Sequence, residues 1–354
     1  MNAAERFTGC MLGGATGDAL GYLIEFDDLK TIRKKYGPYG LRTVLKLEAN
    51  GKKGVISDDT QMSLFTADGL LWADHDGITP QEGLYRSYMR WYYTQTERIV
   101  KPEQMSWMKA QEHEQEWGYD LMNDETLFVR RAPGRTCLIA LALGKCFDKE
   151  HKANNSKGSS TVMRAAPIGL FYSGDPEKAF AVGCQSGWLT HGNPAAYLAA
   201  GTLSAIISFL TQGRELNTAL AGSLAILQKQ ENNTGLLKGI LRAIDEAVTD
   251  RNPVHSMKKI GQGWAADEAM AMAIYCVLKS ETLKDAVIMA CNQDGDSDTC
   301  GAVCGNITGA LYGAAAIPKN WLSNLECLDL LKKMAGCMYE RSLHTTEDDS
   351  LAEM

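Results

Sequence analysis

The chain has 354 residues, of which 45% are hydrophobic and 22% charged, as in an ordinary globular protein. Its net charge of −7 argues against a nucleic-acid backbone as the main partner, so we expect nucleic acid at most as a modified acceptor. The ten cysteines lack metal-ligand spacing and indicate reduced thiols in a cytoplasmic protein. We expect no membrane partner, because there is no apolar signal core and the most apolar stretch, 195–210, is shorter than the roughly 20 residues of a membrane span.

Hydrophobic periodicity predicts an all-α protein. Clean two-residue alternation is scarce, whereas apolar residues recur at three- and four-residue spacing in several segments. These segments are 61–72, 138–146, 194–210, 216–230, 235–248, 265–278 and 283–291. Since no long linker or repeat is visible, we predict a single domain over 1–354 with a polar, aromatic-rich insertion near 102–131.

The first stretch of chemical interest, 13–26, combines small residues at helical spacing with two acids. The glycines indicate close helix packing, and a dinucleotide-binding interpretation is weak because no strand precedes them. Taken alone, Asp18 is typical of a buried polar anchor and Glu25 of a surface charge.

The second stretch, 54–65, begins a helix with acids. Ser57 is suited to cap this helix, and Asp58 and Asp59 would lie in its first turn, where the helix dipole favours negative charge. Capping explains one acid better than two acids between two hydroxyl residues.

Two later stretches are rich in polar groups. The loop 154–164 is suited to bind a phosphate through backbone N–H groups, with charge added by Lys157 or Arg164, although an ordinary polar loop fits as well. His191 lies just before an apolar helix, where a capping or packing role is the common one.

The last stretch, 292–313, joins three aspartates (Asp294, Asp296 and Asp298) to glycines at 301, 305, 309 and 313. Each glycine costs a helix about 1 kcal/mol relative to alanine, so a glycine face indicates that another helix backbone approaches closely. The acids are compatible with a solvated capping loop or with a site for a hard cation.

The two acidic helix starts are far apart in sequence. If they face each other, they supply about six oxygen ligands, enough for a two-metal centre. We therefore predict a compact orthogonal multi-helix bundle with a binuclear metal centre in a central cleft.

Taken together, these motifs resemble the ADP-ribosylglycohydrolase family, of the dinitrogenase-reductase-activating and ADP-ribosyl-acceptor hydrolase type. The resemblance covers most of the chain, and its paired acidic motifs in this order are specific. The motifs are Gly17-Asp-Ala-Leu-Gly-Tyr-Leu-Ile-Glu25, Ser57-Asp-Asp-Thr60, Asn155-Ser-Lys-Gly158 with Val162-Met-Arg164, Thr190-His191, Gly261-Gln-Gly-Trp264 with Glu268-Ala269, and Gly295-Asp-Ser-Asp-Thr299.

The resemblance implies an all-helical enzyme with two divalent cations, Mg²⁺ or Mn²⁺. The implied metal ligands are Ser57, Asp58, Asp59, Asp296, Asp298 and Thr299, and the implied catalytic groups are Glu25, Asp58 and Asp59. Glu25 matches an acid on a loop over the metal centre. The implied substrate-binding residues are Asn155, Ser156, Lys157, Ser159 and His191. The chain departs from the family at Ser159-Ser160, where a glycine-containing pair is frequent.

The implied activity is hydrolysis of the N- or O-glycosidic bond between ADP-ribose and an acceptor. We expect an ADP-ribosylated protein as partner, with arginine favoured, or a small ADP-ribose conjugate. Two alternatives stay open: another binuclear-metal hydrolase that acts on a nucleotide phosphoester, and a non-catalytic ADP-ribose binder. The product separates the first, because it would be phosphate or AMP. Binding without turnover would reveal the second.

Overall fold

The computed structural model describes residues 1–45, 54–97 and 105–352, and helices are the regular elements of this part of the chain, apart from two isolated β-bridges. The predicted all-α class is therefore confirmed. The elements in chain order are α1 (Ala3–Gly21), α2 (Leu29–Tyr36), α3 (Asp58–Asp76), α4 (Pro80–Thr96), α5 (Met105–Met108), α6 (Glu112–Trp117), α7 (Arg135–Ala142), η3 (Ser159–Thr161), α8 (Ala166–Phe171), α9 (Pro176–Trp188), α10 (Pro194–Thr211), α11 (Leu216–Gln228), α12 (Thr234–Ala247), α13 (Pro253–Ile260), α14 (Ala266–Lys279), α15 (Leu283–Cys291), α16 (Ser297–Tyr312), η4 (Ala314–Ala316), α17 (Lys319–Asn324) and α18 (Leu328–Ala352).

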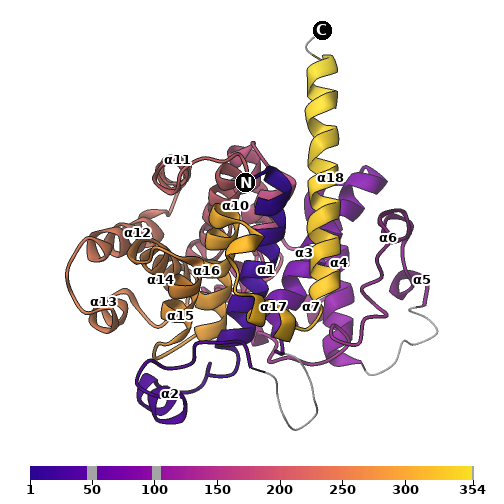
Figure 1. Ribbon diagram of the computed structural model, residues 1–354. Helices are drawn as coiled ribbons and strands as arrows, with labels where there is room; N and C mark the ends of the chain where they lie inside the picture. The colour runs from indigo at the N-terminus through magenta and orange to yellow at the C-terminus, as the bar shows by residue number, and fades with distance from the viewer. Residues whose placement is uncertain (46–53, 98–104, 353–354) are drawn as a thin grey trace.

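Helices α1 and α16 lie side by side in the middle of the molecule (Figure 1). Their glycines face one another along the whole contact: a Cβ on Gly13 would lie 2.2 Å from the carbonyl oxygen of Gly305, and a Cβ on Gly305 would lie 2.0 Å from that of Gly13. The same holds one turn away on either side, where Gly17 meets Gly301 and Gly9 meets Gly309. The expected close approach of a second backbone is confirmed, and the second backbone is the N-terminal helix.

Gly313 lies just beyond the helical part of this stripe. Helix α16 ends at Tyr312, and Gly313 is its C-cap with φ = 76°, a left-handed conformation that favours glycine. The fourth glycine nevertheless packs closely against α1, since a Cβ on Gly9 would lie 2.7 Å from its carbonyl carbon, but it does so as the C-cap and not as part of the helix face.

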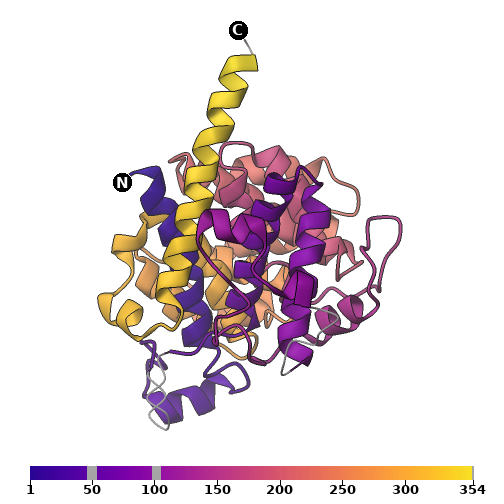
Figure 2. The ribbon, with the colours of Figure 1, turned by 90° about the vertical axis from the view of Figure 1, so that its right-hand side faces the viewer.

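The predicted helical segments mostly match the structure. Segment 283–291 coincides with α15, and 61–72 lies within α3; the predictions for α10, α11, α12 and α14 differ from the structure by at most two residues at each end. Segment 138–146 is wrong at its C-terminal end, since α7 stops at Ala142 and Gly144 has φ = 60°. The periodicity does not predict α4 or α18. Figure 2 shows α18 crossing the body and extending beyond it.

The apolar segment 194–210 is a buried helix, as predicted. Among the described residues, α10 is the one helix long and apolar enough to cross a membrane by length and composition, and 83% of it is buried inside the protein. Helices α8, α9, α11 and α14 pack around it.

The region 102–131, predicted as a polar insertion, is joined to the core by buried charges; residues 102–104 lie outside the described residues. Arg90 of α4 pairs with Glu114 of α6 at 2.9 Å and with Asp68 of α3 at 3.4 Å, and all three side chains are fully buried. His113 also contacts Asp68, at 2.8 Å. Breaking one of these pairs would leave a buried charge uncompensated, so the network fixes α6 against α3 and α4.

Candidate functional site

The tip of α3 is held by one carboxylate from α1. Asp18 is fully buried and accepts hydrogen bonds from the backbone N–H groups of Ser57 (3.0 Å) and Thr60 (3.1 Å), and from the Thr60 hydroxyl (2.5 Å). Burial raises its pKa to about 6, although these donors oppose the shift. The interpretation of Asp18 as a buried polar anchor is confirmed.

Ser57, Asp58 and Asp59 lie at the start of α3, where some of their oxygens make structural hydrogen bonds and one has no partner among the described residues. The Ser57 hydroxyl accepts from the Asp59 N–H (3.1 Å) and so caps the helix as predicted. One oxygen of Asp58 accepts from the Gly134 N–H (2.9 Å). Asp59 Oδ2 is buried without a hydrogen-bond partner in the described part of the chain. Burial is the main cause that raises the pKa of Asp58 to about 8 and that of Asp59 well above its usual range.

The tip of α16 adds a second acidic group. Asp296 caps the helix by accepting from the Thr299 N–H (3.3 Å), and its other oxygen accepts from the Ser159 hydroxyl (2.6 Å). Carboxylate oxygens of Glu25, Asp296 and Asp298 all lie within 4.8 Å of one another. The turn after α1 therefore brings Glu25 to the acids at the tip of α16.

The two acidic helix tips act on each other electrostatically. Burial raises the pKa of Asp298 most, and the negative charge of Asp59 raises it further. Burial, followed by the charges of Asp296, Asp58 and Asp18, raises the pKa of Glu25 to about 8. One carboxylate oxygen of Glu25, like that of Asp59, is buried and has no hydrogen-bond partner among the described residues.

This donor set fits hard divalent cations. Desolvated carboxylates that repel one another gain most from a nearby positive charge, and carboxylate and hydroxyl oxygens are the ligands that Mg²⁺ and Mn²⁺ prefer. The unpartnered oxygens of Glu25 and Asp59 are available for that role.

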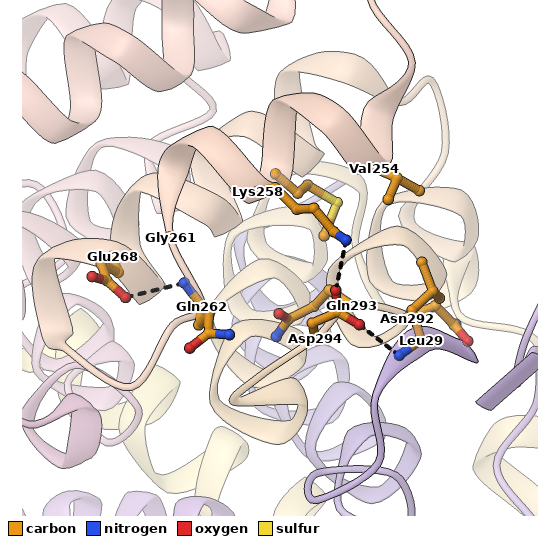
Figure 3. A pocket seen from close by; sticks show the side chains of 10 residues that line it. Leu29, Val254, Lys258, Gly261, Gln262, Glu268, Asn292, Gln293 and Asp294 are labelled. Carbon is orange, nitrogen blue, oxygen red and sulfur yellow. Dashed lines mark hydrogen bonds and ion pairs between the residues drawn. The ribbon is translucent and has the colours of Figure 1, made fainter. Parts of the chain in front are cut away.

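Asp294 does not join this cluster, although the sequence groups it with the other two aspartates. It accepts from the Leu29 N–H at 2.7 Å and pairs with Lys258 Nζ at 3.1 Å, as Figure 3 shows. The chain turns between Asp294 and Asp296 at Gly295, where a Cβ would lie 2.0 Å from the carbonyl oxygen of Gln262. The prediction of three aspartates in one cluster is therefore wrong for Asp294.

The polar loop 154–161 lies beside the acidic cluster. It is joined to the start of α14 by hydrogen bonds from Ser159 N–H to the Trp264 carbonyl (3.2 Å) and from Ala266 N–H to the Lys157 carbonyl (2.9 Å). The side chains of Asn155 and Lys157 are exposed, and the Ser156 hydroxyl accepts from the Gly158 N–H (3.2 Å). Of the residues implied to bind substrate, Ser159 thus lies nearest the acids, through its hydrogen bond to Asp296.

Arg164, near this loop, is fully buried. Arg164 donates to the Ser186 carbonyl (2.9 Å) and the Thr190 hydroxyl (2.7 Å) and stacks over the Tyr88 ring (4.5 Å to the centroid). The idea that Arg164 adds charge at a phosphate site is therefore wrong, because its guanidinium faces the core.

His191 lies beneath the loop. Its Nδ1 pairs with the Thr190 hydroxyl at 2.8 Å, and a Cβ on Gly158 would lie 3.1 Å from its Nε2. Arg164 also donates to that hydroxyl, and the buried Nε2 of His191 has no hydrogen-bond partner among the described residues. Burial lowers the pKa of His191 to about 3, so the ring is neutral at physiological pH.

A pair of aromatic rings marks the rim of the site. Phe26 follows Glu25 and is 78% exposed, and it stacks on Trp264, which is 44% exposed, with ring centroids 6.1 Å apart. Trp264 belongs to one of the quoted motifs and Phe26 follows another, but the sequence did not predict that the two rings stack.

Comparisons with known proteins point to one family. A family model described as ADP-ribosylglycohydrolase matches residues 1–348. The ADP-ribosyl-[dinitrogen reductase] glycohydrolase of Rhodospirillum rubrum is 26% identical over 91% of this chain and 90% of its own length. The ADP-ribosylarginine hydrolase Tri1 of Pseudomonas putida is 22% identical (99% and 82%), and the human ADP-ribosylhydrolase ARH3 is 25% identical (91% and 89%). A solved structure titled ADP-ribosylglycohydrolase-related protein complex shares the fold, with a TM-score of 0.66, 22% identity and coverage of 96% of this chain and 99% of its own.

Proposed function

We propose that this chain, which belongs to the ADP-ribosylglycohydrolase family, hydrolyses the N- or O-glycosidic bond between ADP-ribose and an acceptor, with protein arginine as the preferred acceptor. The name of one relative, an ADP-ribosylarginine hydrolase, supports the arginine preference, and the name of another, an ADP-ribosyl-[dinitrogen reductase] glycohydrolase, supports a protein acceptor. The third relative is named only as an ADP-ribosylhydrolase, so a different linkage or a small ADP-ribose conjugate is the competing acceptor. The ten free thiols support a cytoplasmic location.

The observation that carries the proposal is a group of buried acids from three elements: carboxylate oxygens of Glu25, Asp296 and Asp298 lie within 4.8 Å of one another, and the charge of Asp59 at the tip of α3 raises the pKa of Asp298. Glu25 and Asp59 each have a buried carboxylate oxygen without a hydrogen-bond partner among the described residues. In our proposal the tips of α3 and α16 hold two Mg²⁺ (or Mn²⁺) ions. One ligand set consists of Ser57, Asp58 and Asp59, and the other of Asp296, Asp298 and Thr299. Bound cations of this kind orient substrate hydroxyls and lower the pKa of bound water.

The protein's own groups supply the remaining chemistry. Glu25 has a buried oxygen without a partner at the edge of the cluster, which suits it to accept a proton during hydrolysis. Asp58 and Asp59 are the other candidates for this role. The Asp59 N–H donates to the Ser57 hydroxyl, and the Gly134 N–H donates to the Asp58 carboxylate, so both acids are held in position.

The loop 154–161 would bind the diphosphate and the adjoining ribose. Asn155 and Lys157 present exposed donors there, and Ser156 and Ser159 present hydroxyls. His191 would contribute to binding from beneath the loop, where its Nε2 lies beside Gly158 and its side chain is fully buried. The Ser159 hydrogen bond to Asp296 joins this loop to the acidic cluster.

Turnover on a panel of arginine-, serine- and base-linked ADP-ribose substrates, with and without Mg²⁺, tests the proposal. Asp59→Asn and Asp296→Asn should each lower turnover by about a hundredfold or more, since even residues that only support a metal ligand cost 10–100-fold. Asp294→Asn is the matched control: it lies in the same motif but outside the cluster, and Asn keeps an acceptor for Leu29, so activity should stay within about twofold.

Mass analysis of the product separates the alternatives. Intact ADP-ribose supports the proposal, whereas AMP or inorganic phosphate indicates a phosphoesterase. Calorimetric binding of ADP-ribose without turnover of any substrate indicates a non-catalytic binder. Full activity in both Asp59→Asn and Asp296→Asn would refute the metal assignment.

A further inference from the structure

Helix α2 and its flanks form a positive surface on a negatively charged protein. The segment 27–42 contains five basic and two acidic side chains, whereas the whole chain has a net charge of −7. We call its five basic side chains, all of them exposed, the α2 basic surface: Lys30, Arg33, Lys34, Lys35 and Arg42. The two acids stand at the start, where Asp28 caps the helix and Asp27 pairs with Lys35.

This charge pattern differs from that of an ordinary exposed helix. Only Leu29 and Ile32 of α2 are buried, and the helix lies at the edge of the body opposite the end of α18 (Figures 1 and 2). A solvated helix usually interleaves both signs of charge, which favours solubility and intrahelical pairing. Helix α2 has no acid within its eight residues, so its cations lack intrahelical partners of opposite sign.

The α2 basic surface is fixed relative to the acidic cluster at two points. The first is the hydrogen bond from the Leu29 N–H to Asp294, two residues before Asp296. The second is the stacking of Phe26 on Trp264, because Phe26 lies between Glu25 and α2. A partner bound to α2 would therefore be held at a defined position beside the candidate site.

A cavity widens this surface toward α13. It has a volume of about 430 Å³ and lies between the start of α2 and α13, with Leu29, Val254 and Lys258 among its lining residues (Figure 3). Lys258 is exposed on the far wall, where its charge is balanced by the ion pair with Asp294, and Glu268 also lines the cavity. Gln293 also lines the cavity, and its buried Nε2 donor has no partner among the described residues.

We infer that the α2 basic surface docks an acidic patch on the ADP-ribosylated acceptor protein, and so presents the modified side chain to the acidic cluster. This inference rests on the function proposed above. Opposite charges on two protein surfaces steer association and set orientation. An enzyme whose own charge is negative gains most from such a local positive surface when its partner is also acidic.

A nucleic acid fits this surface less well. Eight helical residues span about 12 Å, whereas duplex DNA carries one negative charge per about 1.7 Å and extends beyond any such short helix. Beyond α2 it would meet a protein whose net charge is negative. The exposed ring of Tyr39 already stacks under Arg42, at 5.6 Å from the ring centroid, which removes one face for base stacking.

The test compares a small and a protein-bound substrate of the same linkage, the one that the panel above turns over fastest. The protein substrates are an acidic carrier, serum albumin, and a basic carrier, lysozyme, each mono-ADP-ribosylated. The docking variant is Lys30→Gln/Arg33→Gln/Lys34→Gln, which neutralises one exposed face of α2 without placing acids at its C-terminal end. The control variant, Lys178→Gln/Lys238→Gln/Lys332→Gln, changes net charge equally with exposed residues of α9, α12 and α18.

The docking variant should raise KM for modified albumin about tenfold, which corresponds to 1.4 kcal/mol, and leave kcat unchanged. It should also reduce the dependence of KM on salt. Its kcat/KM for the small substrate should stay within twofold, and so should all constants of the control variant. The enzyme without substitutions should have a higher kcat/KM for modified albumin than for modified lysozyme. The docking variant should lose this preference.

Three results would overturn the inference alone: an unchanged KM in the docking variant, an equal rise in the control variant, or competition by a 20-base-pair DNA duplex that exceeds competition by unmodified albumin and disappears in the docking variant. The last would assign the surface to nucleic acid. If the enzyme without substitutions turns over neither the small nor the protein substrates, the proposed function fails, and the docking role fails with it. Turnover of the small substrate thus distinguishes the two failures.

Discussion

The contact between α1 and α16 makes a quantitative prediction for Gly305→Ala. The new Cβ would lie 2.0 Å from the carbonyl oxygen of Gly13, whereas real Cβ contacts are essentially never shorter than 3.0 Å. The obstacle is backbone, so it cannot rotate away, and the two helices must separate by at least about 1 Å. Overpacking costs typically about 1–3 kcal/mol, and we expect the upper end here. Alanine returns about 1 kcal/mol of helix propensity, which leaves a net loss of about 2 kcal/mol or more.

Gly336→Ala is the matched control. Gly336 lies in α18, where a Cβ would meet nothing within 4 Å, so alanine should stabilise the protein by up to about 1 kcal/mol. Urea denaturation at 25 °C measures both variants, provided that the slope of free energy against urea stays constant. Gly305→Ala should also weaken Mg²⁺ binding in calorimetry, because α16 carries Asp296 and Asp298 at its tip. A Gly305→Ala protein as stable as Gly336→Ala would refute the packing argument.

Three further predictions concern buried or paired charges. Asp18→Ala should destabilise the protein by about 3 kcal/mol or more, because each of three donors left without an acceptor costs about 1–3 kcal/mol. Asp18→Asn keeps an acceptor and should lose clearly less stability. Equal losses of the two variants in urea denaturation would contradict the role of Asp18 as an acceptor. Arg90→Met should cost about 3–5 kcal/mol in the same assay, since it leaves the carboxylates of Asp68 and Glu114 buried without their cation; a loss below 1 kcal/mol would show that the network matters little. Hydrogen bonds from Ser256, and then from two basic side chains, lower the pKa of Glu246 from 4.5 to about 2, so its contribution is fully present above pH 4.5 and is lost as the pH falls toward 2. The difference in unfolding free energy between the protein and its Glu246→Gln variant should therefore narrow as the pH falls from 4.5 toward 2. A difference independent of pH would exclude this link between protonation of Glu246 and stability.

Local patterns in the sequence were sufficient where one helical turn decides the outcome. The spacing of Gly301, Gly305 and Gly309 predicts a face for close backbone contact, and the structure confirms it. Ser57 caps the helix that it precedes, as its position predicts. Both results depend on residues at most a few positions apart, whose relative placement the helix itself determines.

Local patterns failed where burial depends on distant partners. Arg164 lies in a polar stretch, where a cationic side chain is typical of phosphate binding, yet its guanidinium faces the core. Asp294 lies two residues before Asp296, yet its carboxylate turns toward Leu29 and Lys258. The sequence treats these residues like their neighbours, because nothing within a few positions reveals which side chain will be buried.

The sequence by itself determined the all-helical class and the resemblance that the family comparison confirmed. It also determined that the acidic motifs lie at helix starts and the glycines on one helix face. Only the tertiary structure decided that α1 is the partner of the glycine face, that Glu25 joins Asp296 and Asp298, and that Ser159 bonds to an acid 137 residues away. The physical reason is range: helical periodicity relates residues within a few turns, whereas the approach of two helix tips depends on how the whole core packs.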